Sequence, residues 1–168
     1  IVNIRRHPVD LVFSWVQRGW GHRYISGDPL CFEISYQHDT ADSCVPYFAT
    51  DWSEEYFQAN DYDRVVKSII YLTEKESNAI DNCEDRMCHI YYDHLLSSPK
   101  EEISKVCAFL KKEPHLSMTK VLEKETRDQD ILLSRSDKEN QIYSNVKDKD
   151  SFEKLMSLSK AYEKCISA

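Results

Sequence analysis

The sequence predicts an α/β domain with a parallel sheet flanked by helices and interrupted by a β-hairpin. A short apolar strand, expected to be buried, covers residues 1–4 and runs directly into a helix over residues 8–18. Apolar and polar residues alternate over 31–36, and a second short strand follows a turn-rich segment at 44–48, as in a hairpin. A second core strand is expected over residues 89–92, and its separation from the first requires a helical crossover.

The remaining segments are expected to be helices joined by loops. The helices predicted after the hairpin cover residues 51–57, residues 61 to about 82, a segment that starts at Pro99, residues 115–124 and residues 150–166. Asn60 or Asp61 can cap the second of these, and Ser97 or Ser98 the third. The polar residues 126–148 are predicted to be mostly loop.

Composition limits the function classes. A chain of 168 residues with 41% hydrophobic and 30% charged residues is typical of one ordered domain. The net charge of −7 argues against a nucleic-acid partner, which usually requires a broadly basic domain. No apolar run is long enough to span a membrane, and no signal peptide is present. The chain starts inside an expected strand at Ile1, which suggests a processed chain or a fragment.

Six cysteines leave two interpretations open. Disulfides could join Cys31 to Cys44 and Cys83 to Cys88, or the cysteines could be free thiols, which we slightly prefer. No C-x2-C pair is present, so the spacing predicts no zinc or other metal site. The even count favours the lumen of the secretory pathway over the cytoplasm as the location.

The first 27 residues suggest an anion site. They contain four arginines against Asp10 as their one acidic residue. Arg6 closes the first strand, and Pro8 opens the helix, whose free N–H groups and dipole favour a phosphate. Ser14 lies about two turns further on and can offer a hydroxyl to the same anion. The alternative is a solvated basic turn before a core helix.

Two segments resemble sulfotransferases that use 3′-phosphoadenosine 5′-phosphosulfate (PAPS). Residues 4–15 look like the family's 3′-phosphate-binding segment, in which a strand ends in Arg and Asp and Ser follow, here Arg6, Asp10 and Ser14. Residues 90–110 look like the family's segment of Tyr, an acidic pair, Pro and an amphipathic helix. The acidic pair is Asp93-His94 here, which departs from the family pattern.

The resemblance implies binding roles. Arg6 and Ser14 would hold the 3′-phosphate of PAPS or of adenosine 3′,5′-bisphosphate, and Tyr92 would contact the adenine. A core strand aromatic is the alternative for Tyr92. Arg135 fits the family's phosphate-clamping Arg-Lys-Gly, although the Gly is missing. We expect Lys138 to lie in a solvated charged loop.

The resemblance also implies a single domain over residues 1–168 with a partial P-loop-like sheet, lacking its N-terminal portion. The family's phosphosulfate loop and catalytic base would be expected upstream of Ile1 and are not found in these residues. Gly19-Trp20-Gly21 does not replace the loop, because it follows a helix and not a strand. His22 could be a substitute base, but a hydrogen-bonded loop histidine is the expected alternative. The resemblance thus implies sulfuryl transfer from PAPS to a hydroxyl or amine acceptor, and we expect this chain alone to be inactive.

Two other functions stay open. The chain could be a sulfotransferase-like module that binds a nucleotide or a partner without catalysis. It could also be a helical interaction domain whose motifs match by chance. Neither the acceptor nor the oligomeric state follows from the sequence.

Overall fold

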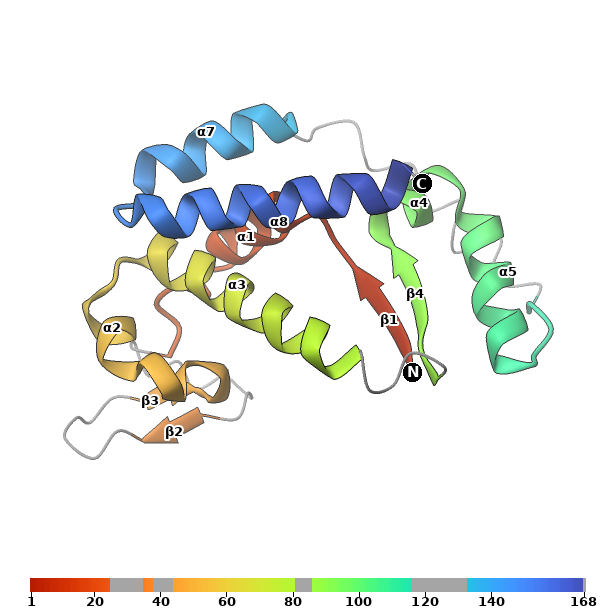
Figure 1. Cartoon of the computed structure of the whole chain (residues 1–168), viewed down its shortest axis with the longest axis horizontal. Helices are drawn as coiled ribbons and strands as arrows, with labels where there is room; N and C mark the ends of the chain where they lie inside the picture. Colours follow the sequence, from red (N-terminus) through yellow and green to blue (C-terminus); the bar gives the residue numbers. More distant parts are fainter. Residues whose placement is uncertain (25–34, 38–43, 81–85, 116–132, 168) are drawn as a thin grey trace.

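The computed structural model describes residues 1–24, 35–37, 44–80, 86–115 and 133–167. These residues are mostly helical and include a two-stranded parallel sheet and a separate two-stranded antiparallel pair (Figure 1). The broad α/β prediction is therefore confirmed. No helix within the described ranges has the length and apolar character needed to span a bilayer.

The parallel pair consists of β1 (Val2–Arg5) and β4 (Cys88–Tyr91), and its register places Arg5 beside Tyr91. Both strands were predicted, with their ends displaced by one residue. The prediction that the first strand is buried is wrong, because Ile1 and Ile4 are 72% and 58% exposed. A sheet of two described strands leaves β1 with an open edge, and nothing among the described residues covers these side chains.

The first helix confirms the local prediction. Helix α1 (Pro8–Gln17) begins with Pro8 at its first turn. His7 caps the helix, because its Nδ1 accepts the Val9 N–H at 3.3 Å. The helix ends before Gly19, whose φ of +72° lies in the left-handed region that glycine adopts without strain.

The predicted hairpin is present in its described part. Strand β2 (Ser35–Gln37) pairs antiparallel with β3 (Cys44–Pro46). A 3-10 helix, η1 (Tyr47–Trp52), and α2 (Ser53–Gln58) follow and account for the predicted short helix. Aromatic side chains from these elements form a small core of their own with Tyr24.

The cysteines are free thiols wherever the structure describes them. Cys44 and Cys88 are free thiols, and their suggested partners, Cys31 and Cys83, lie outside the described residues. Cys107 is buried. The preferred interpretation of free thiols therefore holds for the described cysteines.

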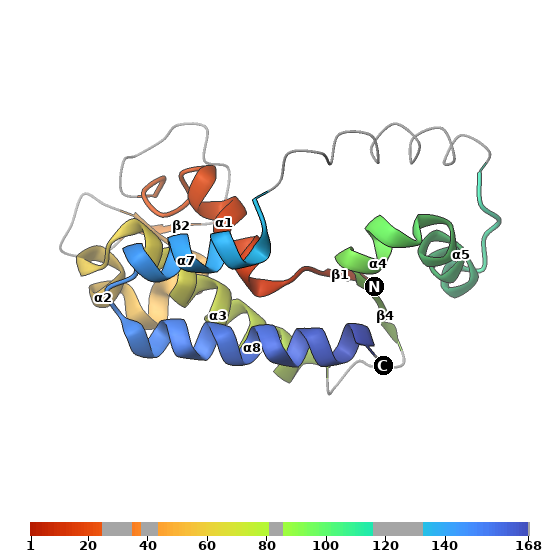
Figure 2. The same cartoon turned by 90° about the horizontal axis from the view of Figure 1, so that it is seen from above.

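The main core forms around α1. Helix α3 (Asp61–Ile80) is capped by Asn60, whose Oδ1 accepts the Asp63 N–H, as predicted. Helices α3, α7 and α8 all pack against α1 (Figures 1 and 2). The buried residues of this core are Val9, Val12, Val65, Val66, Ile69, Ile70, Ile142, Val146 and Leu155.

The C-terminal part contains the largest correction. The loop prediction for residues 126–148 is wrong over α7 (Arg135–Asn145), which Ser134 caps by accepting the Asp137 N–H. This helix buries few apolar side chains, Ile142 among them, so its sequence shows no broad apolar stripe. Helix α8 (Lys149–Ser167) agrees with the prediction for residues 150–166.

The chain after β4 forms two helices. Tyr92 begins α4 (Tyr92–Ser97), so its assignment to the strand is wrong by one residue. Helix α5 (Pro99–Leu110) starts at the predicted proline, but the Ser98 side chain forms no cap hydrogen bond. Figures 1 and 2 show that α5 lies beyond β4, away from α1. Almost all of the predicted helix over 115–124 lies outside the described residues.

Candidate functional site

The centre of the candidate site is a pair of side chains at the ends of the parallel strands. Arg6 directly follows β1 and Tyr92 directly follows β4, and the register of the two strands brings them together. The Arg6 guanidinium carbon lies 5.0 Å from the centre of the Tyr92 ring. The carboxyl ends of parallel strands are where ligands bind in open α/β sheets. The structure thus brings together two of the residues that the sequence selected.

Arg6 has an unusual hydrogen-bonding state. Its Nε atom is buried and has no hydrogen-bond partner among the described residues. A buried donor without an acceptor costs about 1–3 kcal/mol, so such groups are rare and often mark functional sites. No described carboxylate forms an ion pair with Arg6 either. An anionic ligand would supply both the acceptor and the countercharge.

A hollow of about 210 Å³ opens beside Arg6, between β1, α3 and α8. Leu11 and Leu158 form part of its apolar wall. Arg5 and Glu76, which form an ion pair at 3.2 Å, lie at its polar side. The hollow leaves space next to the strand ends, and its lining is more apolar than an anion alone would need.

Arg135 binds two carboxylates at the starts of α1 and α4. Its Nε and Nη2 donate to Asp10 Oδ2 at 3.2 and 2.9 Å, and Nη2 also donates to Asp93 Oδ1 at 2.9 Å. Asp10 belongs to the first turn of α1 and Asp93 to the first turn of α4. Arg135 therefore joins α7 to both helices that start at the strand ends.

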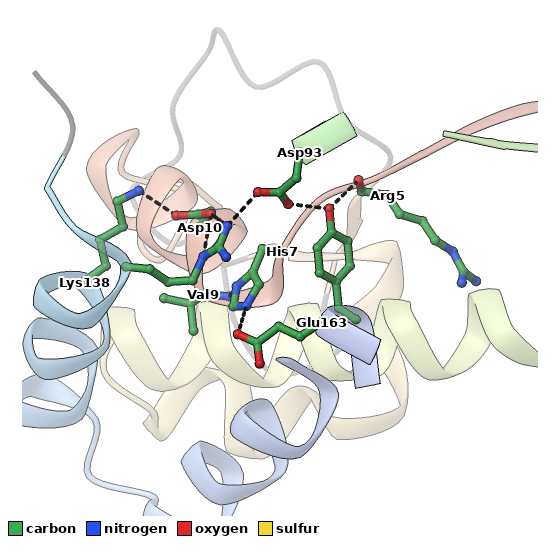
Figure 3. A network of polar contacts seen from close by, with 9 residues as sticks. Arg5, His7, Val9, Asp10, Asp93, Lys138 and Glu163 are labelled. Atoms are coloured by element: carbon green, nitrogen blue, oxygen red, sulfur yellow. Dashed lines mark hydrogen bonds and ion pairs between the residues drawn. The ribbon is translucent and has the colours of Figure 1, made fainter. Parts of the chain in front are cut away.

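Lys138 is part of the same ion cluster. Its Nζ lies 2.5 Å from Asp10 Oδ1, and the residue is buried (Figure 3). The prediction of a solvated loop position for Lys138 is wrong, because α7 places Lys138 one turn after Arg135 on the face that packs against α1. Arg135 and Lys138 are three residues apart, so they would share one face of a helix, but the loop prediction for this segment hid that relation.

The carboxylates of the cluster stay ionised. Burial raises the pKa of Asp10, but the hydrogen bonds and charges of Lys138 and Arg135 outweigh burial and lower it below its ordinary value. Asp93 behaves in the same way. Burial raises its pKa, but hydrogen bonds from Tyr162 and Arg135 outweigh burial, so the pKa of Asp93 is below its ordinary value. Asp10 and Asp93 balance the charges of Arg135 and Lys138, whereas none of the described carboxylates pairs with Arg6.

Helix α8 contacts the site through Tyr162 and Glu163. Tyr162 donates its hydroxyl proton to Asp93 Oδ2 at 2.7 Å. His7 is fully buried, and its Nε2 lies 3.3 Å from Glu163 Oε1 (Figure 3). Since Nδ1 accepts from Val9, the proton of the neutral ring lies on Nε2 and is donated to Glu163. Two adjacent residues of α8 thus hold the start of α1 and the start of α4.

Ser14 and His22 lie further along the chain. Ser14 is one helical turn beyond Asp10, so it shares the face of α1 that receives Arg135. His22 follows the opposite end of α1, and its Nδ1 lies 3.1 Å from Asp61 Oδ2. Its side chain is 59% exposed. The structure therefore does not bring His22 to Arg6, and its environment fits the alternative of a hydrogen-bonded loop histidine.

Sequence reasoning did not assign a role to three residues of the site: Asp93, Lys138 and Tyr162. Within the described ranges no group of His, Cys, Asp and Glu side chains is arranged to hold a metal ion.

Comparisons with protein-family models, curated proteins and solved structures returned no significant match. The function must therefore be argued from the geometry of the site.

Proposed function

We propose that this chain carries the 3′-phosphate-binding part of a sulfotransferase-like site that takes PAPS or adenosine 3′,5′-bisphosphate. The observation that supports it most is the Arg6 side chain, with its buried, unpartnered Nε, stacked over Tyr92 at the carboxyl ends of two parallel strands. In this proposal the two strands are part of a P-loop-like sheet.

The proposed ligand fits the chemistry of these side chains. A phosphate dianion would accept from Arg6 and replace its missing partner. The start of α1 adds the partial positive charge of a helix N-terminus. The ring of Tyr92 would offer an aromatic surface to the adenine. Arg135 uses Nε and Nη2 for its carboxylates, and Nη1 has no acceptor among the described residues, so it could donate to a ligand.

In a sulfotransferase, sulfuryl transfer depends on positioning and on stabilising the charge of the leaving phosphate, as in phosphoryl transfer. This chain would contribute the grip on the 3′-phosphate and would orient the cosubstrate toward a hydroxyl or amine acceptor. The proton of the acceptor would be removed by a base. His22 is a poor candidate for that base, because it lies at the end of α1 remote from Arg6.

The remote position of His22 favours a second proposal. The chain could hold a 3′-phosphorylated nucleotide, or a partner with that group, without transferring sulfate. Incubation with PAPS and a mixed panel of phenols, alcohols and amines tests whether this chain transfers sulfate by itself. We expect no sulfated product from this chain by itself, and a measurable turnover would contradict that expectation.

The proposed function is tested by thermal unfolding with adenosine 3′,5′-bisphosphate. A ligand present at 100 times its dissociation constant stabilises the native state by about 2.7 kcal/mol, so the melting temperature should rise. The Arg6→Ala variant should lose this rise. The control is Arg18→Ala, which removes an exposed arginine just after α1 and should behave like the parent. The proposal fails if the parent shows no rise, or if Arg6→Ala keeps it.

A further inference from the structure

We infer that Asp93 is a positioning residue that aims the Arg135 guanidinium at the 3′-phosphate, and that Tyr162 holds Asp93 in place. This inference rests on the proposed function, because it concerns the same phosphate. Asp93 was not among the residues for which the sequence predicted a role, and it is not expected to touch the ligand itself.

The first step of the argument is the geometry of Arg135. A guanidinium is planar, so two fixed acceptors determine the direction of its remaining N–H groups. Asp10 takes Nε and Nη2, and Asp93 takes Nη2 from another helix. The side chain of Arg135 is still 32% exposed. Its Nη1 is therefore held in one direction, and within the described part of the chain nothing accepts a hydrogen bond from it.

The second step is the fixation of Asp93. One of its oxygens binds Arg135, and the other accepts the hydroxyl proton of Tyr162 at 2.7 Å. The Tyr162 ring is packed edge-on against the rings of His7 and Tyr91, with centroids 5.4 and 5.5 Å away. Because that ring is wedged between two others, its hydroxyl is a fixed donor and restrains the carboxylate.

The third step is the place of Asp93 in the chain. It directly follows Tyr92, the residue stacked on Arg6. The contact between Asp93 and Arg135 therefore sets the distance between Arg135 and the Arg6–Tyr92 pair. The attachment of α7 does not depend on Asp93, since Asp10 binds both Arg135 and Lys138 and Ile142 is buried in the core.

Calorimetric titration with adenosine 3′,5′-bisphosphate tests the inference on the full chain. Asp93→Asn keeps the shape of the side chain but weakens its hold on Arg135, and we expect about tenfold weaker binding. Tyr162→Phe keeps the packed ring, removes the hydroxyl, and should weaken binding in the same direction. Asp93→Glu restores the charge and should recover part of the affinity. Glu139→Gln removes a carboxylate from α7 that contacts neither Arg135 nor Arg6, and should match the parent.

A double-mutant cycle distinguishes positioning from a general structural effect. In an Arg135→Ala background, Asp93→Asn should cause no further loss, because Asp93 acts through Arg135. An equal loss in both backgrounds would overturn the inference. If Asp93→Asn does not fold, Tyr162→Phe takes its place in the same cycle.

The outcome for the parent separates this inference from the function on which it rests. Absence of binding by the parent would contradict the proposed function itself. Binding by the parent, together with unchanged affinity in Asp93→Asn and Tyr162→Phe, would overturn the role of Asp93 and leave the proposed function standing.

Discussion

The Arg6 guanidinium lies over the ring of Tyr92, with 5.0 Å between its central carbon and the ring centroid. The two residues are 86 positions apart in the sequence, and the parallel register of β1 and β4 brings them together. Cation–π contacts of this kind contribute about 0.5–2 kcal/mol. The pairing also places an aromatic surface and a positive charge at one point, which is the combination that a phosphorylated nucleoside requires.

A first prediction concerns the role of Tyr92. Stacking of a base on an aromatic side chain is worth about 1–3 kcal/mol, so Tyr92→Leu should weaken binding of adenosine 3′,5′-bisphosphate by roughly 5- to 150-fold. Tyr92→Phe keeps the ring and should bind nearly as well as the parent. Titration calorimetry provides the measurement. Equal affinity in all three proteins, with lower stability in the Leu variant alone, would instead identify Tyr92 as a core aromatic.

A second prediction tests the docking of α7. Ile142 is fully buried in the main core, so Ile142→Ala should lower the free energy of unfolding by about 2–5 kcal/mol. Asn140→Ala changes an exposed position of the same helix and should cause no loss. Urea unfolding followed by circular dichroism measures both. A loss below about 0.5 kcal/mol for Ile142→Ala would show that α7 is not packed as described.

The α7 segment also shows what the sequence could not reveal. Ordinary capping and periodicity rules predicted α1, α3 and α8, because each combines a start signal or a broad apolar face with adequate length. In α7 the apolar face is narrow, and ion pairs from Arg135 and Lys138 to Asp10 help to attach the helix to α1. Lys138 looks like a loop residue in the sequence because its partner, Asp10, is 128 positions away.

The site was predictable only in part, because its motifs are local in the sequence but its ion pairs are not. Arg6, Ser14, Tyr92 and Arg135 were selected from local motifs, and the structure places Arg6 against Tyr92 and Arg135 against the face of α1 that carries Ser14. The carboxylate partners of Arg135 follow only from tertiary packing. The exposure of Ile1 and Ile4 also depends on which strands lie beside β1, which residue patterns alone do not determine.

A third prediction concerns pH. Burial, together with the charge of Arg135, lowers the pKa of His7, although Glu163 partly opposes this. The unfolded chain therefore takes up the proton more readily than the folded one, so stability falls as the pH drops below about 6.5. The lowered pKa values of Asp10 and Asp93 act in the same direction at lower pH, since their stabilisation is present above about pH 4 and disappears as the pH falls through their folded-state values.

The His7→Asn variant isolates the first of these effects. Asparagine keeps a good helix-capping acceptor but does not titrate. Melting temperatures between about pH 7.5 and pH 5 should therefore fall less for His7→Asn than for the parent, since the histidine contribution begins near pH 6.5. Parallel curves for the two proteins over this range would contradict a lowered pKa for His7.

A fourth prediction concerns the thiols. Cys165 is exposed on α8, whereas Cys88 and Cys107 are buried. Alkylation of the native protein with iodoacetamide, followed by peptide mass spectrometry, should therefore label Cys165 well before the two buried cysteines. In denaturant the three should react at similar rates. Native labelling of Cys88 as fast as Cys165 would contradict the burial of the Cys88 thiol.

The central claim is that Arg6 and its neighbours bind a 3′-phosphate. The most direct measurement compares the melting temperature of the parent chain with equal concentrations of adenosine 3′,5′-bisphosphate and adenosine 5′-monophosphate, which lacks that phosphate. We predict a clear rise with the bisphosphate and a much smaller one with the monophosphate. Equal shifts with both nucleotides, or no shift with either, would contradict the claim.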